Sequence, residues 1–356
     1  MVQFEYDIAI IGAGPAGAAC ALGLKDSGLK VAIFDKATFP RDKVCGDAIP
    51  ARAVRVLREV APEAAKVLQG LEWKTDTRSC KVISPSDDVF TYHFSVQGHC
   101  AKRLDFDAFL FTQMKAHAHV DCFEGKAITG LNRNEHGWEL ETADQQFQAR
   151  LVIGCDGANG LTTKATTDFQ MDPQHHCAAV RAYYKNVGGL SPDTMEIYLL
   201  KDWLPGYFWI FPVSETECNV GYGMLSAQVA KRKVALRQSI PSIVESHPAL
   251  RQRFKEAKLQ GPIQGFGLPL GSRMIQMSGA NFLLTGDAAS LIDPATGEGI
   301  GNAMWSGQIA ARWAIKAFQQ HELSEEFLAG YGLEIRKKME RELRYKYWVQ
   351  QLLGCL

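Results

Sequence analysis

The sequence predicts an α/β fold in which a mostly parallel sheet is interrupted by a second, mostly antiparallel sheet and followed by long helices. Three observations predict it. Short buried-strand patterns at residues 6–11, 30–34 and 151–154 are interleaved with helical segments, one of them at 51–69. Residues 177–266 contain mainly strand patterns, at 178–184, 195–199, 207–212 and 217–224, followed by one helical stretch at about 226–256. A further buried strand at 281–285 precedes two long helical patterns, so the first sheet is predicted to be discontinuous in the chain.

The bulk composition excludes several classes of protein. The 356 residues include 39 Lys plus Arg and 39 Asp plus Glu, so no global field favours nucleic acid or an anionic membrane. Nine cysteines are scattered without CxxC or zinc-site spacing, which predicts no metal site and reduced thiols. Residues 1–7 contain two acids and no secretory signal, so we expect a cytoplasmic location.

A glycine-rich turn near the start carries the most specific signal in the chain. The turn reads GAGPAG over residues 12–17, between a strand at 6–11 and a helix at about 18–27. A second strand at 30–34 ends in Asp35. Strand, glycine turn, helix, strand and acid in this order form the Rossmann-like dinucleotide fingerprint.

Each residue of the fingerprint has a physical role. Gly12 permits the tight turn, and Gly14 lets the backbone approach a pyrophosphate at the positive end of the helix. Gly17 lets helix and strand pack closely, and Asp35 can accept hydrogen bonds from both ribose hydroxyls. A carboxylate at residue 35 disfavours the 2′-phosphate of NADP, so FAD or NAD is expected. The alternative is a strand–helix turn whose glycines serve only packing.

A second glycine turn lies near residue 298. The strand at 281–285 delivers Gly286 and Asp287 to its end, and a Pro/Gly loop then leads into a helix. Asp287 can hold a polyol hydroxyl, and the helix N-terminus can stabilise negative charge on a reduced flavin. A plain NAD dehydrogenase, which is a minor alternative, has no use for such a second site, so FAD is the expected cofactor.

On these motifs the sequence resembles the FAD-dependent family that contains p-hydroxybenzoate hydroxylase-like monooxygenases, flavin halogenases and geranylgeranyl reductases. The resemblance implies a glutathione reductase-type FAD-binding domain with an inserted α+β substrate domain. It implies that the cofactor is bound by Gly12, Gly14, Pro15, Ala16, Gly17, Asp35, Lys36, Arg41, Arg103, Ala127, Asp156, Gly286, Asp287, Pro294, Gly297, Gly299 and Ile300. Arg103 opens a helix predicted at 103–118 with Asp105 as its N-cap. Asp156 either contacts the cofactor or caps the next turn.

Two segments resemble the geranylgeranyl reductase branch most. Residues 40–46 read PRDKVCG, and residues 205–212 read PGYFWIFP, which fits the Tyr-x-Trp-x-Phe-Pro signature of that branch. Halogenases carry Trp-x-Trp-x-Ile-Pro instead. The resemblance implies that Cys45 lies near the flavin and that Tyr207 and Trp209 line the substrate cavity, so these three are the predicted catalytic residues. The alternatives are a small buried Cys45 and aromatic side chains that serve only as sheet core. Asp47 departs from the branch, where Gly is common.

The resemblance also implies a function. We expect an FAD-dependent oxidoreductase that reduces C=C bonds of a small apolar, isoprenoid-like substrate by hydride transfer from reduced flavin. An aromatic monooxygenase on the same scaffold and a non-catalytic flavin electron carrier are the alternatives. No second complete fingerprint exists, so the electron donor is expected to be a transiently bound NAD(P)H or a protein.

The chain is divided by these motifs into three parts. The prediction is a discontinuous FAD-binding domain (1–72, 99–176 and 267–320), a substrate domain (73–98 and 177–266) and a C-terminal helical segment (321–356). The last helix, at about 324–353, is basic, and Trp348, Leu352 and Leu353 lie near its end. It is expected to pack on the domain, with peripheral membrane contact as the alternative.

Overall fold

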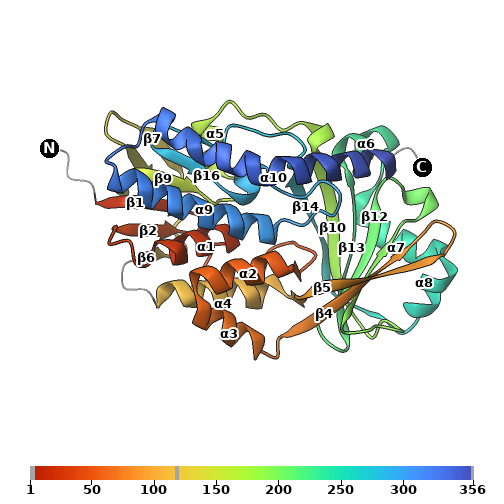
Figure 1. Ribbon diagram of the computed structural model, residues 1–356. Helices are drawn as coiled ribbons and strands as arrows, with labels where there is room; N and C mark the ends of the chain where they lie inside the picture. Colours follow the sequence, from red (N-terminus) through yellow and green to blue (C-terminus); the bar gives the residue numbers. More distant parts are fainter. Residues whose placement is uncertain (1–4, 117–119, 354–356) are drawn as a thin grey trace.

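The computed structural model describes residues 5–116 and 120–353, which contain two sheets and the helices that cover them (Figure 1). Five strands of the first sheet run parallel, in the order β16 (Phe282–Leu284), β9 (Gln146–Gly154), β1 (Tyr6–Ile11), β2 (Val31–Phe34) and β6 (Val120–Phe123). Antiparallel pairing adds β15 (Ser278–Gly279) and the hairpin of β7 (Gly130–Arg133) and β8 (Trp138–Glu141). The apolar run of β1 suits a central strand that is covered on both faces. The predicted Rossmann-like part is confirmed.

The second sheet is mostly antiparallel, as predicted. Its order is β14 (Lys258–Pro269), β10 (His176–Lys185), β13 (Glu217–Leu225), β12 (Tyr207–Pro212), β11 (Thr194–Tyr198), β4 (Lys74–Ile83), β5 (Val89–Ala101) and β3 (Ala48–Ile49). Only the pair of β11 and β4 is parallel among these neighbours of the described chain, and it places Met195 beside Cys80. Two chain segments far apart in sequence therefore build one sheet.

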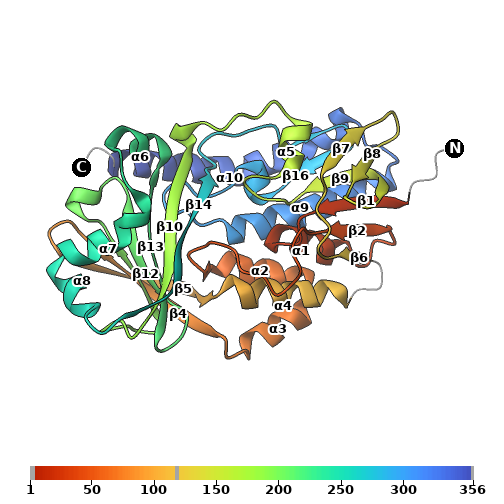
Figure 2. The ribbon, with the colours of Figure 1, turned by 180° about the vertical axis from the view of Figure 1, so that it is seen from behind.

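Most helices lie against one of the two sheets. Figure 1 shows α1 (Pro15–Leu24), α2 (Ala51–Val60), α3 (Pro62–Gln69) and α4 (Arg103–Lys115) together on one side of the first sheet. Seen from behind in Figure 2, α7 (Leu236–Ser246) and α8 (Pro248–Arg253) lie beyond the second sheet, away from the first. Shorter elements are α5 (Leu161–Thr166), α6 (Ser226–Arg232), and the 3-10 turns η1 (Pro173–His175), η2 (Lys201–Trp203) and η3 (Gly286–Ala289).

Helix α1 packs directly against α9 (Ile300–Gln319) through small residues. A Cβ on Gly307 would lie 2.2 Å from the carbonyl oxygen of Ala16, so the two helices approach as closely as backbone allows. Glycine at this crossing is thus a packing requirement. Because the crossing involves the first turn of α1, it brings the beginning of α1 close to α9.

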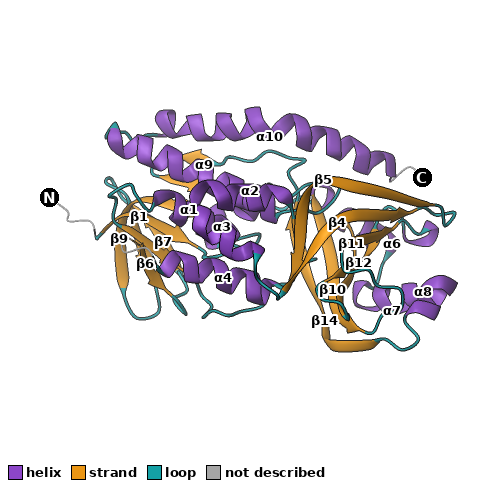
Figure 3. Ribbon diagram, turned by 60° about the horizontal axis from the view of Figure 1, so that its bottom comes forward, coloured by secondary structure: helices purple, strands orange, loops and turns teal. Residues whose placement is uncertain are grey.

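The last helix, α10 (Glu325–Leu353), runs from the first sheet to the far end of the second (Figures 1 and 3). Its inner side is buried against α9 and β15, and the buried side chains are Leu328, Tyr331, Ile335, Met339 and Leu343. Tyr345, Trp348 and Leu352 are exposed near its end. The helix packs on the domain, and membrane contact stays a prediction. No helix of the described chain is long and apolar enough to cross a membrane.

Several predicted helices are wrong in their bounds. The pattern at 51–69 is two helices, because Pro62 cannot continue α2 and leaves Ala61 extended (φ −150°, ψ 77°). The stretch at 226–256 is three helices, since Lys233 turns into the left-handed region and Pro248 begins a new helix. Strand β14 was not among the predicted strands.

The predicted cap of the fourth helix is also wrong. Lys102 holds the N-cap position of α4, and Asp105 lies in its first turn. An acid in the first turn still interacts favourably with the helix dipole, which explains why the pattern resembled a cap. The predicted end at residue 118 lies outside the described residues.

Candidate active site

A cavity of about 1300 Å³ is lined by residues from both sheets. The first glycine turn contributes Gly12 and Gly14, and the second contributes Gly297 and Gly299. The two turns, far apart in sequence, therefore border one space. Most of the predicted cofactor residues line it: Gly12, Gly14, Pro15, Ala16, Asp35, Lys36, Arg41, Arg103, Ala127, Asp156, Asp287, Pro294, Gly297, Gly299 and Ile300.

Gly17 and Gly286 are not among the residues that border the cavity. A Cβ on Gly17 would lie 1.9 Å from the Gly12 carbonyl oxygen, so Gly17 holds the turn against the helix. The Gly286 amide donates to Ser306 Oγ (2.9 Å) inside α9. Both glycines shape the site from behind, which is a packing role.

The first turn of α1 suits a pyrophosphate. Gly14 is the N-cap, no side chain caps the helix, and its first turn contains no acid. A Cβ on Gly14 would meet only Arg41 Nη2, at 3.6 Å, so the space in front of the backbone is open. An anionic dinucleotide binds to backbone amides that lack a side-chain partner and face a cavity at the positive end of a helix. These residues fit FAD.

Asp35 holds the backbone around the fingerprint. One carboxylate oxygen accepts from the Ala13 amide and the other from the Ala37 amide, each at 2.9 Å. Its carbonyl accepts from the Lys126 amide (2.9 Å), which fixes the segment that carries Ala127 beside it. Each oxygen of a carboxylate has a second lone pair, so binding of the ribose hydroxyls by Asp35 stays a prediction.

A buried ion cluster lies behind the cavity wall. Asp107 accepts from Arg103 Nε (2.6 Å) and Nη2 (2.7 Å), and from Arg41 Nη1 (2.5 Å). The Asp107 side chain is fully buried, and that of Arg103 is 4% exposed. Burial alone would raise the pKa of Asp107, but the two guanidinium groups outweigh burial and lower it. Two cations share one anion, so the cluster leaves net positive charge for the pyrophosphate.

The loop that carries Cys45 is tied to the second sheet by Asn219. Asn219 Nδ2 donates to the Cys45 carbonyl (2.7 Å) and to Asp47 Oδ2 (2.8 Å), and Trp209 Nε1 donates to Asn219 Oδ1 (2.9 Å). Tyr183 OH also donates to Asp47 Oδ2 (2.7 Å). Asn219 thus connects the loop with the aromatic wall of the cavity.

Asp47 is fully buried, and its Oδ1 atom has no hydrogen-bond partner among the described residues. Its φ of +66° explains why glycine suits this position. Burial raises the pKa of Asp47 to about 6, against the opposing hydrogen bonds from Tyr183 and Asn219. The folded protein therefore holds this proton more tightly than the unfolded chain.

We expect Asp47→Asn to stabilise the protein above pH 6. The folded pKa lies above the ordinary 3.8, so wild-type stability falls as the pH rises from about 4 to about 6. The difference between the two pKa values corresponds to about 3 kcal/mol of the free energy of unfolding. The amide side chain of the variant carries no such proton, so the variant should keep this free energy as the pH rises. Urea unfolding from pH 4 to 7.5 measures it. The matched control is Asp87→Asn, an exposed residue with the same φ of +66°. Parallel pH profiles for wild type and Asp47→Asn would contradict the prediction.

Tyr207, Trp209 and Phe211 alternate along β12, so they share one face, and all three border the cavity. The ring centroids of Tyr207 and Trp209 lie 5.8 Å apart, and those of Trp209 and Phe211 lie 6.1 Å apart. Trp209 is 6% exposed. Cys45 also borders the cavity and is half-buried. The catalytic roles of Cys45, Tyr207 and Trp209 stay predictions.

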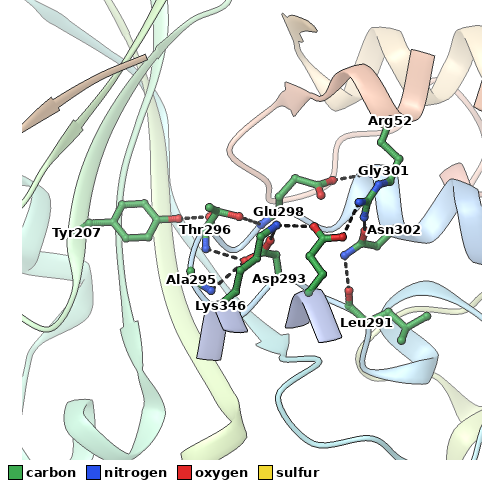
Figure 4. A network of polar contacts seen from close by, with 11 residues as sticks. Arg52, Tyr207, Leu291, Asp293, Ala295, Thr296, Glu298, Gly301, Asn302 and Lys346 are labelled. Atoms are coloured by element: carbon green, nitrogen blue, oxygen red, sulfur yellow. Dashed lines mark hydrogen bonds and ion pairs between the residues drawn. The ribbon is translucent and has the colours of Figure 1, made fainter. Parts of the chain in front are cut away.

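The second glycine turn is held by Asp293 and by the last helix (Figure 4). Asp293 Oδ1 accepts from the amides of Ala295 (2.9 Å) and Thr296 (3.1 Å), while Oδ2 accepts from Lys346 Nζ (2.5 Å) of α10. The Tyr207 hydroxyl donates to the Thr296 carbonyl from the other side. This turn is therefore fixed between the aromatic wall and α10.

Further polar contacts close the beginning of α9. Glu298 Oε1 accepts from the Gly301 amide (2.6 Å), and burial raises the pKa of Glu298 to about 7. Arg52 donates to Asn302 Oδ1 and, at 2.8 Å, to Glu342 of α10. Among the described residues, no side chain accepts a hydrogen bond from the other amides in the first turn of α9. Stabilisation of a reduced flavin by this helix end stays a prediction.

Asp156 caps the next turn, the second of its two predicted roles. Its Oδ2 accepts from the Thr162 amide (2.9 Å) and hydroxyl (2.8 Å) at the start of α5. Its Oδ1 is buried and has no hydrogen-bond partner in residues 5–116 and 120–353, and burial raises the pKa of Asp156. Because Asp156 also borders the cavity, cofactor contact stays a prediction beside the cap.

Five site residues were missed by the sequence reasoning. They are Asp107, Arg52, Asn219, Asp293 and Lys346. Asp107 follows Arg103 by four residues on one helix, and this i,i+4 spacing of opposite charges predicts an ion pair. Asp293 caps a local turn through the amides of Ala295 and Thr296, and an Asp before Pro is a usable turn signal. Arg52, Asn219 and Lys346 act across long sequence separations, and no local pattern marks them.

The comparisons with known proteins agree with this geometry. The family model described as "FAD binding domain" matches residues 5–344. A digeranylgeranylglycerophospholipid reductase of Methanopyrus kandleri is 27% identical, over 96% of this chain and 87% of its own length. A menaquinone reductase of Mycobacterium tuberculosis is 29% identical, over 87% of this chain and 76% of its own length.

A solved structure has the same fold. The geranylgeranyl bacteriochlorophyll reductase-like protein of Thermoplasma acidophilum superposes with a TM-score of 0.86 at 22% identity, covering 99% of this chain and 88% of its own. Together, fold, cavity and relatives define the class, an FAD-dependent oxidoreductase, as predicted. More particularly, the chain belongs to the FAD binding domain family.

Proposed function

We propose that the protein reduces C=C bonds of an apolar, isoprenoid-like substrate. The observation that carries the proposal is the single cavity, which joins the two cofactor turns to the wall of Tyr207, Trp209 and Phe211. The relatives named as lipid and quinone reductases support it. A simple electron carrier would need no such apolar space beyond its cofactor.

The residues of the chain have distinct proposed roles. The amides at the start of α1 and the Arg41–Arg103–Asp107 cluster bind the pyrophosphate. FAD, when bound, supplies the hydride. Tyr207 and Trp209 hold the alkene and exclude water, and Cys45 positions the substrate or delivers the proton. An external electron donor, either a nicotinamide or a protein, reloads the cofactor. Eight free cysteines in the described chain support a reducing, cytoplasmic setting.

An anaerobic assay tests this function against the hydroxylase alternative. The holoenzyme, reduced with dithionite without oxygen, is mixed with geranylgeraniol, and the product is read by mass spectrometry. A reductase adds two hydrogens per double bond. Turnover that requires oxygen and adds an oxygen atom to a phenolic substrate instead would overturn the proposal.

We expect Trp209→Phe to raise KM in this assay by about fivefold with FAD content unchanged. The substitution keeps an aromatic wall but leaves Asn219 Oδ1 without the hydrogen-bond donor that orients this wall. The loss should cost about 1 kcal/mol of substrate-binding free energy, which corresponds to the expected rise in KM. The flavin absorbance of the purified protein measures FAD content. Trp73→Phe is the control, because Trp73 packs on Phe109 and does not border the cavity. An unchanged KM for Trp209→Phe would contradict a role in substrate binding.

A further inference from the structure

Strand β5 carries an uncovered apolar stripe, which consists of Phe90, Tyr92, Phe94 and Val96. Phe90 and Tyr92 alternate in the regularly paired part of the strand, so their side chains lie on one face. Phe94 and Val96 follow in an irregular part of the ladder and border the same cavity as Tyr92. Phe90 is 79% exposed, and Tyr92 and Val96 are each 61% exposed. The rings of Tyr92 and Phe94 pack edge to face at 5.7 Å. Exposed apolar side chains gathered in a row indicate a binding surface.

The stripe continues the wall of the cavity. Tyr92, Phe94 and Val96 border the cavity themselves. Cys80 lies opposite Tyr92 in the sheet, Met195 lies opposite Cys80, and both also border the cavity. One face of the paired strands β11, β4 and β5 therefore leads from the cavity to Phe90 near the hairpin end.

The opposite face of the same strand segment has a different character. Thr91 and His93 alternate with Phe90 and Tyr92 and are polar and exposed. Strand β3 pairs with β5 only at Cys100 and His99, so in the described chain no strand covers the outer edge beside the stripe. The apolar residues thus gather on the face that leads into the cavity.

We propose that the β5 stripe binds the far end of a linear apolar chain whose reacting double bond lies at Tyr207 and Trp209. This subsite rests on the proposed function and deepens it, because it selects substrates by the length of their apolar chain. The charge at the hairpin end favours a single chain over a lipid surface. Asp87 and Asp88 directly precede the strand and are exposed, and carboxylates there oppose docking on anionic headgroups.

A chain-length series tests the subsite without requiring turnover. Geraniol, farnesol, geranylgeraniol and solanesol, each delivered from cyclodextrin, are titrated into oxidised holoenzyme, and Kd is read from flavin fluorescence. We expect Kd to fall along the series. Phe90→Ser and Tyr92→Ser should each raise the Kd of solanesol by about five- to tenfold, because each removes an apolar contact with the far end of the chain. The Kd of geraniol should stay unchanged.

The matched control is Val89→Ser, an exposed apolar residue (59%) on the same strand but on the opposite face. Its Kd values should equal those of the wild type. If Phe90→Ser leaves every Kd unchanged, or weakens all four probes equally, the subsite is overturned. It is also overturned if Phe90→Ser alters only co-sedimentation with phosphatidylcholine or phosphatidylglycerol vesicles, because the stripe would then be a membrane contact. Failure of the proposed function shows separately, as absent anaerobic turnover with this binding gradient retained.

Discussion

Replacing Asp107 by Asn is expected to remove about 3–5 kcal/mol of the free energy of unfolding. The side chain is fully buried and is the shared partner of Arg103 and Arg41. An amide keeps the size but not the charge, so Arg103 would remain buried as an uncompensated cation. A domain stability of about 5–15 kcal/mol leaves little after such a loss.

Urea unfolding at pH 7 measures this cost, and the flavin absorbance of the purified variant reports FAD binding. The matched control is Asp105→Asn, two residues earlier on α4 and only half-buried, whose carboxylate forms no ion pair within the described part of the chain. Its unfolding free energy should change by less than about 1 kcal/mol. If Asp107→Asn does not fold, the double variant Arg103→Met/Asp107→Leu removes both charges and should recover part of the stability. Equal effects of the two Asn substitutions would refute the buried cluster.

The parts of the fold that were predicted correctly are those specified by local signals. The strand at 6–11, the turn at 12–17 and the strand at 30–34 each follow from short-range geometry of glycine and apolar runs. The parallel sheet then follows, because a strand–helix–strand unit closes in one hand. The inserted sheet was predicted from its strand patterns, but β14 was not, since glycines at 261, 265 and 267 break its alternation.

The polar framework of the site could not be predicted in the same way. Asn219 bonds to Asp47 across 172 residues of sequence, and Lys346 bonds to Asp293 across 53. Such pairs depend on how two sheets and the last helix meet, and nothing in the composition of either segment specifies the partner. The family resemblance supplied the cavity-lining residues, whereas the residues that hold them in place came only from the structure.

Gly12→Ala is expected to abolish FAD binding and to destabilise the sheet. A Cβ at residue 12 would lie 2.3 Å from the Cys155 carbonyl oxygen, with φ at +102°. That oxygen belongs to backbone at the end of β9 and cannot turn away, so β1 and β9 must separate where the cofactor binds. The overlap should lower the free energy of unfolding by about 3 kcal/mol, and the left-handed backbone should lower it by about 1–2 kcal/mol more. FAD affinity should fall at least ~100-fold.

Two other glycines separate the causes of this loss. Gly28→Ala introduces the same kind of backbone strain (φ +73°), but no atom of the described residues lies within 4 Å of the added Cβ. The free energy of unfolding should therefore fall by about 1–2 kcal/mol, and FAD should remain bound. At Gly14, a Cβ would meet only Arg41 Nη2 at 3.6 Å, so the apoprotein should keep its stability. That Cβ would nevertheless occupy the space in front of the α1 amides, and FAD affinity should fall by about tenfold or more. Unfolding curves of the apoproteins and FAD titrations measure both quantities. Unchanged FAD affinity in Gly14→Ala would mean that these glycines serve packing alone, because only a bound pyrophosphate can sense a side chain placed in an otherwise open space.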